Sequence, residues 1–210
     1  MYKIKKLYSR QIINSRGNPT LEVDVTLNNN IVGRAAVPSG ASTGKYEALE
    51  LLDGNKLFYK GKSVSNAMAN INNEIYRSIK NLEFFDYKTF DNHLINLDNT
   101  SNKSRLGANA ILGCSLAFVD AIAKAQNIYL FELFSKTNKR FLMPTPMMNV
   151  INGGEHSNNS LDIQEIMIFP VAAKSFTQTI QIGCEIFQTL KALLDKKGFS
   201  TNVGDEGGFS

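Results

Sequence analysis

Two stretches of this chain combine an acidic residue with glycines in a pattern that could do chemistry. In the first, a glycine-rich loop of short polar residues carries His156 and leads into a segment, 162–169, whose side chains alternate like those of a strand. Glu165 lies on a face of that segment that is otherwise apolar, because alternate side chains of a strand point to opposite faces. A carboxylate on such a face is costly to bury unless a metal, a lysine or a hydrogen-bond network meets it. We therefore expect Glu165 and His156 to belong to a functional site.

The second stretch is the acidic turn GDEGGF at 204–209, which follows a short segment, 201–205, that we expect to be a strand. Taken alone, such a turn is also typical of solvated acids on a surface loop. If Glu165 and Glu206 came within about 4 Å of each other, their repulsion at an effective dielectric of about 20 would be about 4 kcal/mol. One of the two carboxyls would then hold a proton at neutral pH, as a general acid requires.

A third stretch, PSGASTGK at 38–45, contains hydroxyl residues and glycines without an apolar anchor. This composition suits a loop that closes over a ligand and, slightly better, a flexible connector. Ser39 is the hydroxyl at its start, and hard cations such as Mg²⁺ prefer oxygen ligands of this kind.

The composition is that of a globular chain, with 43% hydrophobic residues and a net charge of +4. The tight basic cluster is limited to Lys3, Lys5 and Lys6, so nucleic-acid binding is not indicated. Cys114 and Cys184 form no metal-ligand spacing, and we expect both to be reduced core thiols. No signal-peptide pattern and no run of about 18 apolar residues indicates secretion or a membrane span, so we expect a cytoplasmic protein.

The elements that would position these residues fall into two groups. The first group contains three alternating strands joined as a meander, expected at 3–13, 20–27 and 31–37. It also contains helices with apolar residues spaced by three or four, expected at 63–82, 88–97 and 107–126. The spacing places Ile71, Ile75 and Ile79 on the apolar side of the first helix and Leu112 on the buried stripe of the last. We therefore expect an α+β domain over residues 1–135, with a charged, proline-containing linker at 136–146.

The second group, residues 147–210, is expected to be the first part of an α/β barrel of the TIM type. Its expected elements are strands at 147–152 and 162–169, a helix at 175–197 and a strand at 201–205. Phe176 and Ile180 are among the helix residues that we expect to face inward. Only about 70 residues follow the linker, whereas a complete barrel takes roughly 250, so the barrel is incomplete in this chain.

Several stretches, in this order along the chain, together resemble the enolases, the phosphopyruvate hydratases of glycolysis. The matching stretches are SRGNPTLEV at 15–23, PSGASTGKYEALEL at 38–51, NKSRLGANAIL at 102–112, MPTPMMN at 143–149, NVINGGEHSNNSLDIQEIMIFP at 149–170 and VGDEGGF at 203–209. The resemblance covers nearly every residue here but only about the first half of an enolase, so we expect an N-terminal fragment.

The resemblance implies the reversible dehydration of 2-phospho-D-glycerate to phosphoenolpyruvate and water, with Mg²⁺ as cofactor. It implies that Glu206 donates the proton with Glu165 beside it, that Gln164 contacts the substrate and that His156 reaches the active site. The family's base lysine and its main magnesium ligands would lie beyond Ser210, so we expect this chain alone to be inert.

The resemblance also implies that the 38–45 loop is a mobile lid, on which Ser39 supplies oxygen ligands to a second Mg²⁺ ion. It implies a homodimer in the full-length protein, located in the cytoplasm and in some family members also at the cell surface or secreted. Four positions depart from the family pattern without affecting an assigned catalytic residue, namely Asn14, Leu52, Asn55 and Ser210. The alternative function is a shortened, non-catalytic binding or scaffold protein.

Overall fold

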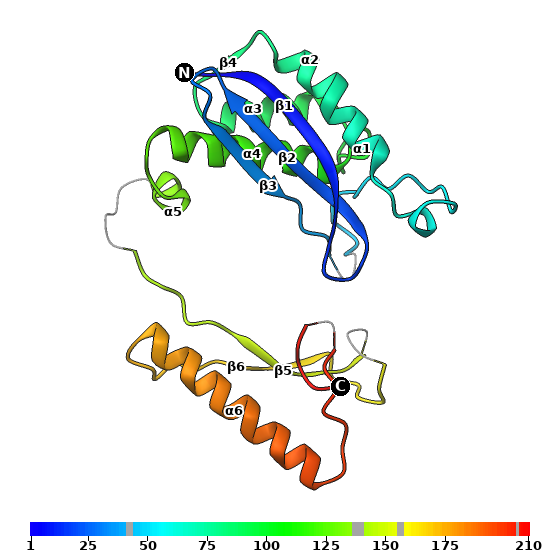
Figure 1. The fold of residues 1–210 in the computed structure, drawn as a ribbon, viewed down its shortest axis with the longest axis vertical. Helices are drawn as coiled ribbons and strands as arrows, with labels where there is room; N and C mark the ends of the chain where they lie inside the picture. Colours follow the sequence, from blue (N-terminus) through cyan, green and yellow to red (C-terminus); the bar gives the residue numbers. More distant parts are fainter. Residues whose placement is uncertain (41–43, 136–140, 155–157, 205) are drawn as a thin grey trace. The chain divides into compact units, whose positions relative to one another are not determined.

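The structure is a computed structural model that describes residues 1–40, 44–135, 141–154, 158–204 and 206–210. The chain divides into two compact units, Met1–Lys139 and Arg140–Ser210 (Figure 1). The expected linker at 136–146 falls partly on residues outside the described ranges, so the domain boundaries drawn from the sequence stay a prediction.

The first unit is built around an antiparallel sheet with the strand order β3-β2-β1-β4 (Figure 1). Its strands are β1 Tyr2–Ile13, β2 Pro19–Leu27, β3 Val32–Ala36 and β4 Glu83–Phe84. The expected meander is confirmed, because β1 pairs with β2 and β2 with β3 in antiparallel register. The sequence did not indicate β4, which pairs with the start of β1, since two residues are too few to show alternation.

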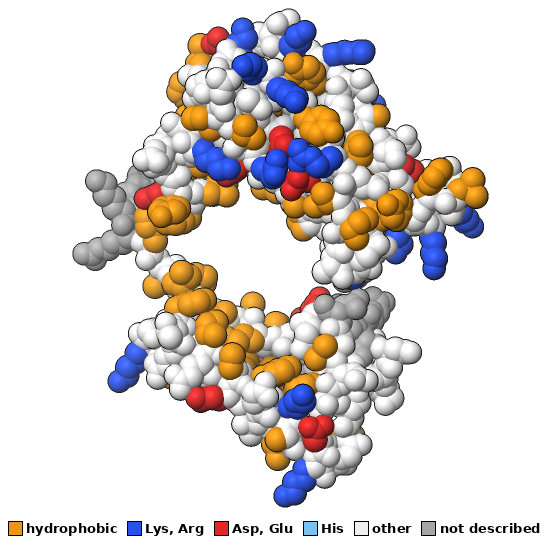
Figure 2. Space-filling model, in the orientation of Figure 1, with side chains coloured by type: hydrophobic (Ala, Val, Ile, Leu, Met, Phe, Trp, Pro, Cys, Tyr) orange, Lys and Arg blue, Asp and Glu red, His pale blue; other side chains and the backbone are white. Residues whose placement is uncertain are grey.

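Alternation along β2 determines which face of the sheet is buried. Leu21, Val23 and Val25 are fully buried, while the residues between them are half-buried on the outer face. That outer face carries an ion-pair cluster formed by Arg10, Glu22, Asp24 and Arg34. Acidic and basic side chains accordingly gather next to one another on the first unit in Figure 2. The sheet therefore has one apolar and one charged face.

Helices supply the rest of the first unit. They are α1 Ser65–Ala69, η2 Asn70–Ile75, α2 Tyr76–Ile79, α3 Tyr87–Asp98, α4 Ala108–Ala125 and α5 Leu130–Phe134, with a 3₁₀ turn, η1, at Tyr59–Gly61. α1, the π-helical η2 and α2 follow one another without a break, so they form the single helix expected from the apolar spacing after residue 63. The helices expected at 88–97 and 107–126 are present as α3 and α4, whereas α5 was not expected.

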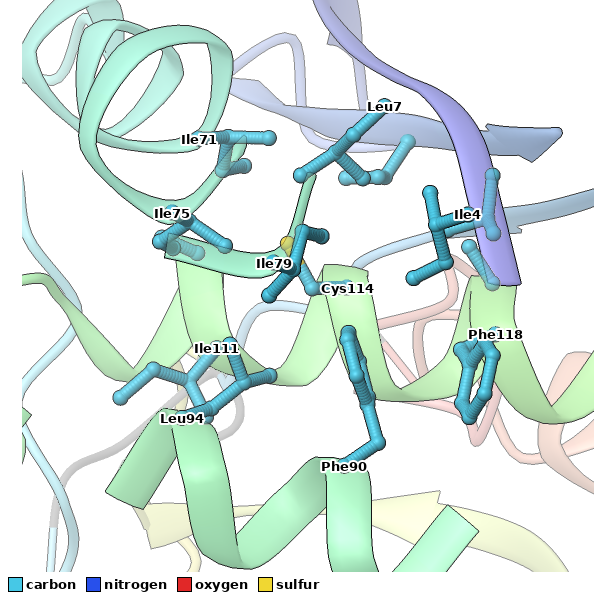
Figure 3. Close-up of a cluster of buried hydrophobic side chains, with 14 of the residues drawn as sticks. Ile4, Leu7, Ile71, Ile75, Ile79, Phe90, Leu94, Ile111, Cys114 and Phe118 are labelled. Atoms are coloured by element: carbon cyan, nitrogen blue, oxygen red, sulfur yellow. The ribbon is translucent and has the colours of Figure 1, made fainter. Parts of the chain in front are cut away.

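α4 is the central helix of the hydrophobic core (Figure 3). Phe118 on this helix is fully buried, and its ring centre lies 4.3 Å from that of Phe90. A glycine permits the close approach of α4 to β3, because a Cβ at Gly33 would lie 2.1 Å from the carbonyl oxygen of Ala117. By length and composition α4 could cross a membrane, but 61% of it is buried inside the unit, as in the core helix of a globular protein.

Leu112 and Cys184 differ in burial from the sequence expectation, whereas Cys114 agrees with it. Leu112 was expected on the buried stripe of α4, yet it is 40% exposed. Cys114 is a core thiol as expected, and burial raises its pKa. Cys184 is exposed, so the expectation of a second core thiol is wrong. Helical spacing identifies the apolar positions of a helix but not what packs against them.

The second unit contains two antiparallel strands, β5 Met148–Asn152 and β6 Glu165–Ile168, followed by the helix α6 Phe176–Lys196 (Figure 1). α6 contacts the strands through small surfaces. A Cβ at Gly183 would lie 2.1 Å from the sulfur of Met148, so this glycine allows the helix to approach β5. Phe176 and Ile180 were expected to face inward but are exposed, because a two-stranded sheet cannot cover a helix of 21 residues.

Two expected strands of the second unit are corrected by the structure. The strand expected at 162–169 begins only at Glu165, because the backbone before it forms bends and closes the preceding loop. In that closure the carbonyl of Gln164 accepts from the amide of Gly153 at 2.8 Å. Of the strand expected at 201–205, the described residues 201–204 form one bridge, Val203 to Phe209, and residue 205 lies outside the described ranges. The glycines of this segment favour a turn over an extended strand.

Candidate active site

The side-chain amide of Asn149 joins the two carboxylates that the sequence singled out. Its Nδ2 donates to Oε2 of Glu165 at 3.2 Å and to Oε2 of Glu206 at 3.4 Å. Both oxygens contact one nitrogen, so they can be no farther apart than the two distances combined. The structure therefore brings Glu165 and Glu206 together, and their catalytic roles stay a prediction.

Strand register places Glu165 at this point. It is the first residue of β6 and stands opposite Asn152, the last residue of β5. The register of β5 shifts between Asn149 and Ile151, so the strand carries a bulge beside the carboxylates. A bulge inserts one extra residue and re-aims the neighbouring side chains, which is a common device next to active sites.

The last residues of the described chain place Glu206. Phe209 donates its amide to the carbonyl of Val150 at 2.9 Å and accepts from the amide of Asn152 at 2.8 Å, which forms a parallel bridge with β5. The ring of Phe209 is buried and stacks on Phe187 of α6 at 4.4 Å between centres. This anchor holds the preceding acidic turn against the strand.

A tight turn completes the placement of Glu206. The amide of Gly207 donates to the carbonyl of Gly204 at 3.0 Å, and the amide of Gly204 donates to the carbonyl of Gly208 at 2.8 Å. Gly207 has φ +84°, a conformation that residues with a side chain rarely adopt. The glycines therefore form a turn in which Glu206 is exposed and its carboxylate accepts a hydrogen bond from Asn149.

Two further residues of the predicted site belong to the loop between β5 and β6. Gln164 is exposed and directly precedes Glu165, so the polypeptide itself keeps it near the carboxylate pair. His156 lies outside the described residues, and its predicted position is therefore a prediction still.

Ser39 lies in the first unit, where both of its oxygens are engaged. Its hydroxyl donates to Oε1 of Glu50 at 2.9 Å. Its carbonyl accepts from Nη2 of Arg16 at 2.9 Å, and the same nitrogen donates to the carbonyl of Gly40 at 3.0 Å. Arg16 therefore fastens the start of the 38–45 loop to the turn between β1 and β2.

The turn that carries Arg16 is well anchored, although Asn14 departs from the pattern seen in the resemblance. Oδ1 of Asn14 accepts from the backbone amides of Arg16 and Asn18, each at 3.0 Å. A backbone bond from Asn14 to the carbonyl of Asn18 at 2.9 Å closes the turn. An amide oxygen thus provides the anchoring that a carboxylate could provide.

The oxygen atoms of Ser39 have the chemical character that Mg²⁺ prefers, and in this structure they bond to Arg16 and Glu50. Within the described part of the chain, no group of three or more His, Cys, Asp or Glu side chains could hold a metal ion. The hydroxyl and the carbonyl oxygen of Ser39 could fill only part of the coordination of Mg²⁺, an ion that usually shares its ligands with water and substrate phosphate.

A cavity of about 480 Å³ lies beside the start of the same loop and is lined by Pro38, Gly40, Glu50, Asp91 and Leu112, among others. Oδ1 of Asp91 is buried and has no hydrogen-bond partner among the residues that the structure describes. Burial raises the pKa of this carboxyl. No sequence pattern indicated Asp91, because it occupies an ordinary position in a helix.

Sequence reasoning also did not assign Asn149 or Arg16. Asn149 stands at the start of the first stretch singled out from the sequence, next to residues that favour strands. That its amide donates to Glu165 and Glu206 depends on the bulge in β5 and on the position of the 204–209 turn, neither of which a sequence pattern indicates. Arg16 lies in a turn whose partner carbonyls are 23 and 24 residues away. Its one available signal was an arginine in a glycine-containing turn ahead of a loop without apolar residues.

Two family models match the chain. The model described as Enolase, N-terminal domain matches residues 4–134, and the model described as Enolase, C-terminal TIM barrel domain matches residues 140–210. Together with the antiparallel sheet and helices of the first unit, these matches confirm the expected fold class, an α+β domain followed by the start of an α/β barrel.

Proposed function

This chain belongs to the enolase family, and we propose from that premise that its residues serve the reversible dehydration of 2-phospho-D-glycerate to phosphoenolpyruvate and water. The family is one of hydro-lyases. The observation that carries the proposal is the meeting of Glu165 and Glu206 at one amide donor. Two carboxylates held together from separate segments are a known arrangement for keeping one carboxyl protonated for acid catalysis.

Glu206 is the proposed proton donor. The reaction expels a hydroxide, which is a poor leaving group until a proton reaches it, so an acid must stand beside the leaving oxygen. Glu206 projects from an exposed turn, whereas Glu165 is half-buried at a strand end. The exposed carboxyl can approach a substrate while the half-buried one supplies the neighbouring charge.

Mg²⁺ is the proposed cofactor, because a divalent ion on the substrate carboxylate counters the charge that builds up when the neighbouring proton is removed. Ser39 is the proposed lid ligand to a second ion, through oxygens that now contact Glu50 and Arg16. Gln164 and His156 are proposed to contact the substrate from the loop before β6. The substrate itself, 2-phosphoglycerate or phosphoenolpyruvate, is the proposed small-molecule partner.

Residues 1–210 do not include the base lysine and the main magnesium ligands that the family resemblance implies. We therefore propose that the chain is inactive by itself. A homodimer and a cytoplasmic location are proposed on the family resemblance. The ion pairs on the outer face of the β1–β3 sheet are compatible with contact between that face and water.

Activity is tested by joining residues 1–210 in frame to the remaining barrel of an enolase, which supplies the base and the main metal ligands. The joined protein and the 1–210 chain are assayed with 2-phosphoglycerate and Mg²⁺ by the ultraviolet absorbance of the enol product. We expect turnover from the joined protein and none from the 1–210 chain. The Glu206→Gln variant should lower the rate by about 10² to 10⁴, the usual contribution of a general acid.

A matched control is Glu185→Gln, which changes an exposed acid on α6 in the same way. Its rate should equal that of the unmodified joined protein. A joined protein that folds but does not turn over would contradict the proposed function, and would favour a binding or scaffold role. Unchanged activity in Glu206→Gln would contradict the assignment of the acid.

A further inference from the structure

We propose that Asn149 is a positioning residue for the acid pair, and that Gly208 keeps open the space that its side chain needs. The inference deepens the proposed function and rests on it, since the pair matters only if Glu206 is an acid. The structure assigns this role through three observations: a shared amide donor, a strand bulge beside it, and a glycine packed against the amide.

The chemistry of an amide explains what Asn149 does to the pair. An amide nitrogen carries two N–H donors and cannot accept, so each of its bonds needs an acceptor lone pair and favours an unprotonated carboxylate oxygen. Oε2 of Glu165 and Oε2 of Glu206 are the two acceptors. Asn149 thereby favours the other oxygen of Glu206 as the one that carries the proton of the proposed acid.

The orientation of the Asn149 amide follows from the same contacts. Turning the amide by half a rotation would place Oδ1, an acceptor, against two acceptor oxygens. In the observed orientation Oδ1 is buried and has no hydrogen-bond partner among the described residues. The two bonds to carboxylates, which are stronger than bonds between neutral groups, outweigh that loss.

Gly208 packs against the side-chain amide of Asn149 on the side of its oxygen, Oδ1. A Cβ built on it would lie 2.6 Å from Oδ1 of Asn149, 2.6 Å from Oδ1 of Asn152 and 2.8 Å from the backbone nitrogen of Ile151. The Ile151 nitrogen belongs to the backbone of β5 and cannot rotate aside as a side chain can, and Asn152 is completely buried with both its side-chain polar atoms unpartnered among the described residues. Any side chain at position 208 would therefore push the Asn149 amide away from the carboxylates.

The bridge is tested on the 1–210 chain by carbon NMR of the side-chain carboxyls, which does not require activity. Asn149→Ala and the near-isosteric Asn149→Asp should each shift the signals of both Glu165 and Glu206. Gly208→Ala should shift the same two signals and the side-chain amide signal of Asn149 as well. Backbone amide spectra establish that each variant remains folded, and Asn149→Asp serves where the alanine variant does not fold.

A matched control removes an amide-to-carboxylate bond elsewhere in the same unit. Nε2 of Gln181 donates to Oε1 of Glu185 at 2.8 Å on the exposed side of α6. Gln181→Ala should shift the signal of Glu185 and leave those of Glu165 and Glu206 in place. If a folded Asn149 variant shifts one or neither of those two signals, the amide does not bridge them and the proposal is overturned.

The functional consequence is tested on the joined protein described above. A displaced acid should lower kcat of Asn149→Ala by up to about 100-fold, while KM changes by less than about threefold, because misplacement affects the reacting geometry more than binding. Equal loss in kcat and gain in KM, or no change in kcat, would overturn the positioning role. Absence of turnover in the unmodified joined protein would instead refute the proposed function, and the NMR result would still decide whether the bridge exists.

Discussion

Removal of one carboxylate at the start of the long helix should destabilise the first unit by a predictable amount. The helix begins at Ser65, and its N-cap residue makes no side-chain hydrogen bond. Asp53 supplies the cap from a distance: Oδ1 accepts from the amide of Asn66 at 2.9 Å and Oδ2 from that of Ser65 at 3.0 Å. Loss of a capping side chain typically costs about 0.5 to 2 kcal/mol.

Each oxygen of Asp53 accepts one bond from a backbone amide, so the two substitutions at this position should differ. Asp53→Ala removes both bonds and should cost about 1 to 2 kcal/mol of unfolding free energy at pH 7. Asp53→Asn keeps one acceptor oxygen and should cost roughly half as much, about 0.5 to 1 kcal/mol.

The contribution of Asp53 should depend on pH with a definite sign. Burial acts to raise the pKa of this carboxyl, but the hydrogen bonds from Asn66 and Ser65 outweigh it and hold the pKa below its ordinary value. A depressed pKa in the folded state stabilises the fold above the unfolded value of about 4, and the stabilisation is lost as pH falls through the folded pKa. The difference between wild type and Asp53→Ala should therefore shrink in acid.

The assay is urea unfolding followed by far-ultraviolet circular dichroism at pH 7 and at a series of lower pH values. Glu83→Ala, at an exposed position of β4, is the control and should change stability by less than about 0.5 kcal/mol. Equal costs for the asparagine and alanine variants would refute the division between two acceptor oxygens. A wild-type advantage that persists unchanged in acid would refute the charge-dependent part of the reasoning.

Three further outcomes are expected. Phe118→Ala should cost about 3 to 5 kcal/mol in urea unfolding, because the ring is fully buried, and a loss below 1 kcal/mol would contradict its place in the core. Arg34→Ala should raise the pKa of Asp24, which is held below its ordinary value first by the side-chain hydrogen bond from Arg34, and carbon NMR titration would show no change if that bond does not form. A thiol reagent near neutral pH should label Cys184 at once and Cys114 only after unfolding, since burial covers Cys114 and raises the pKa of its thiol; mass spectrometry of equal labelling would contradict this.

Local sequence patterns predicted the buried face of a strand or helix correctly where one neighbouring layer covers that face. Alternation along β2 predicted its buried face, because every second side chain of a strand points to the same face of the sheet and helices cover one face of this sheet. Helical spacing predicted Ile71, Ile75 and Ile79 as buried, and all three are fully buried. The same reasoning was wrong for Phe176 and Ile180, because in this unit too little sheet faces α6 to cover them.

The sequence by itself determined the kinds of element, the three-stranded meander and the glycine-bracketed stretches in which the acids lie. Only the tertiary structure decided that Asn149 donates to both Glu165 and Glu206, and that Arg16 holds the carbonyl of Ser39. The physical reason is that hydrogen bonds depend on where a bulge, a turn and a returning chain place donor and acceptor atoms to within a few tenths of an ångström. The residue type determines whether an atom can donate or accept a hydrogen bond, and the fold determines which partner atom lies within bonding distance.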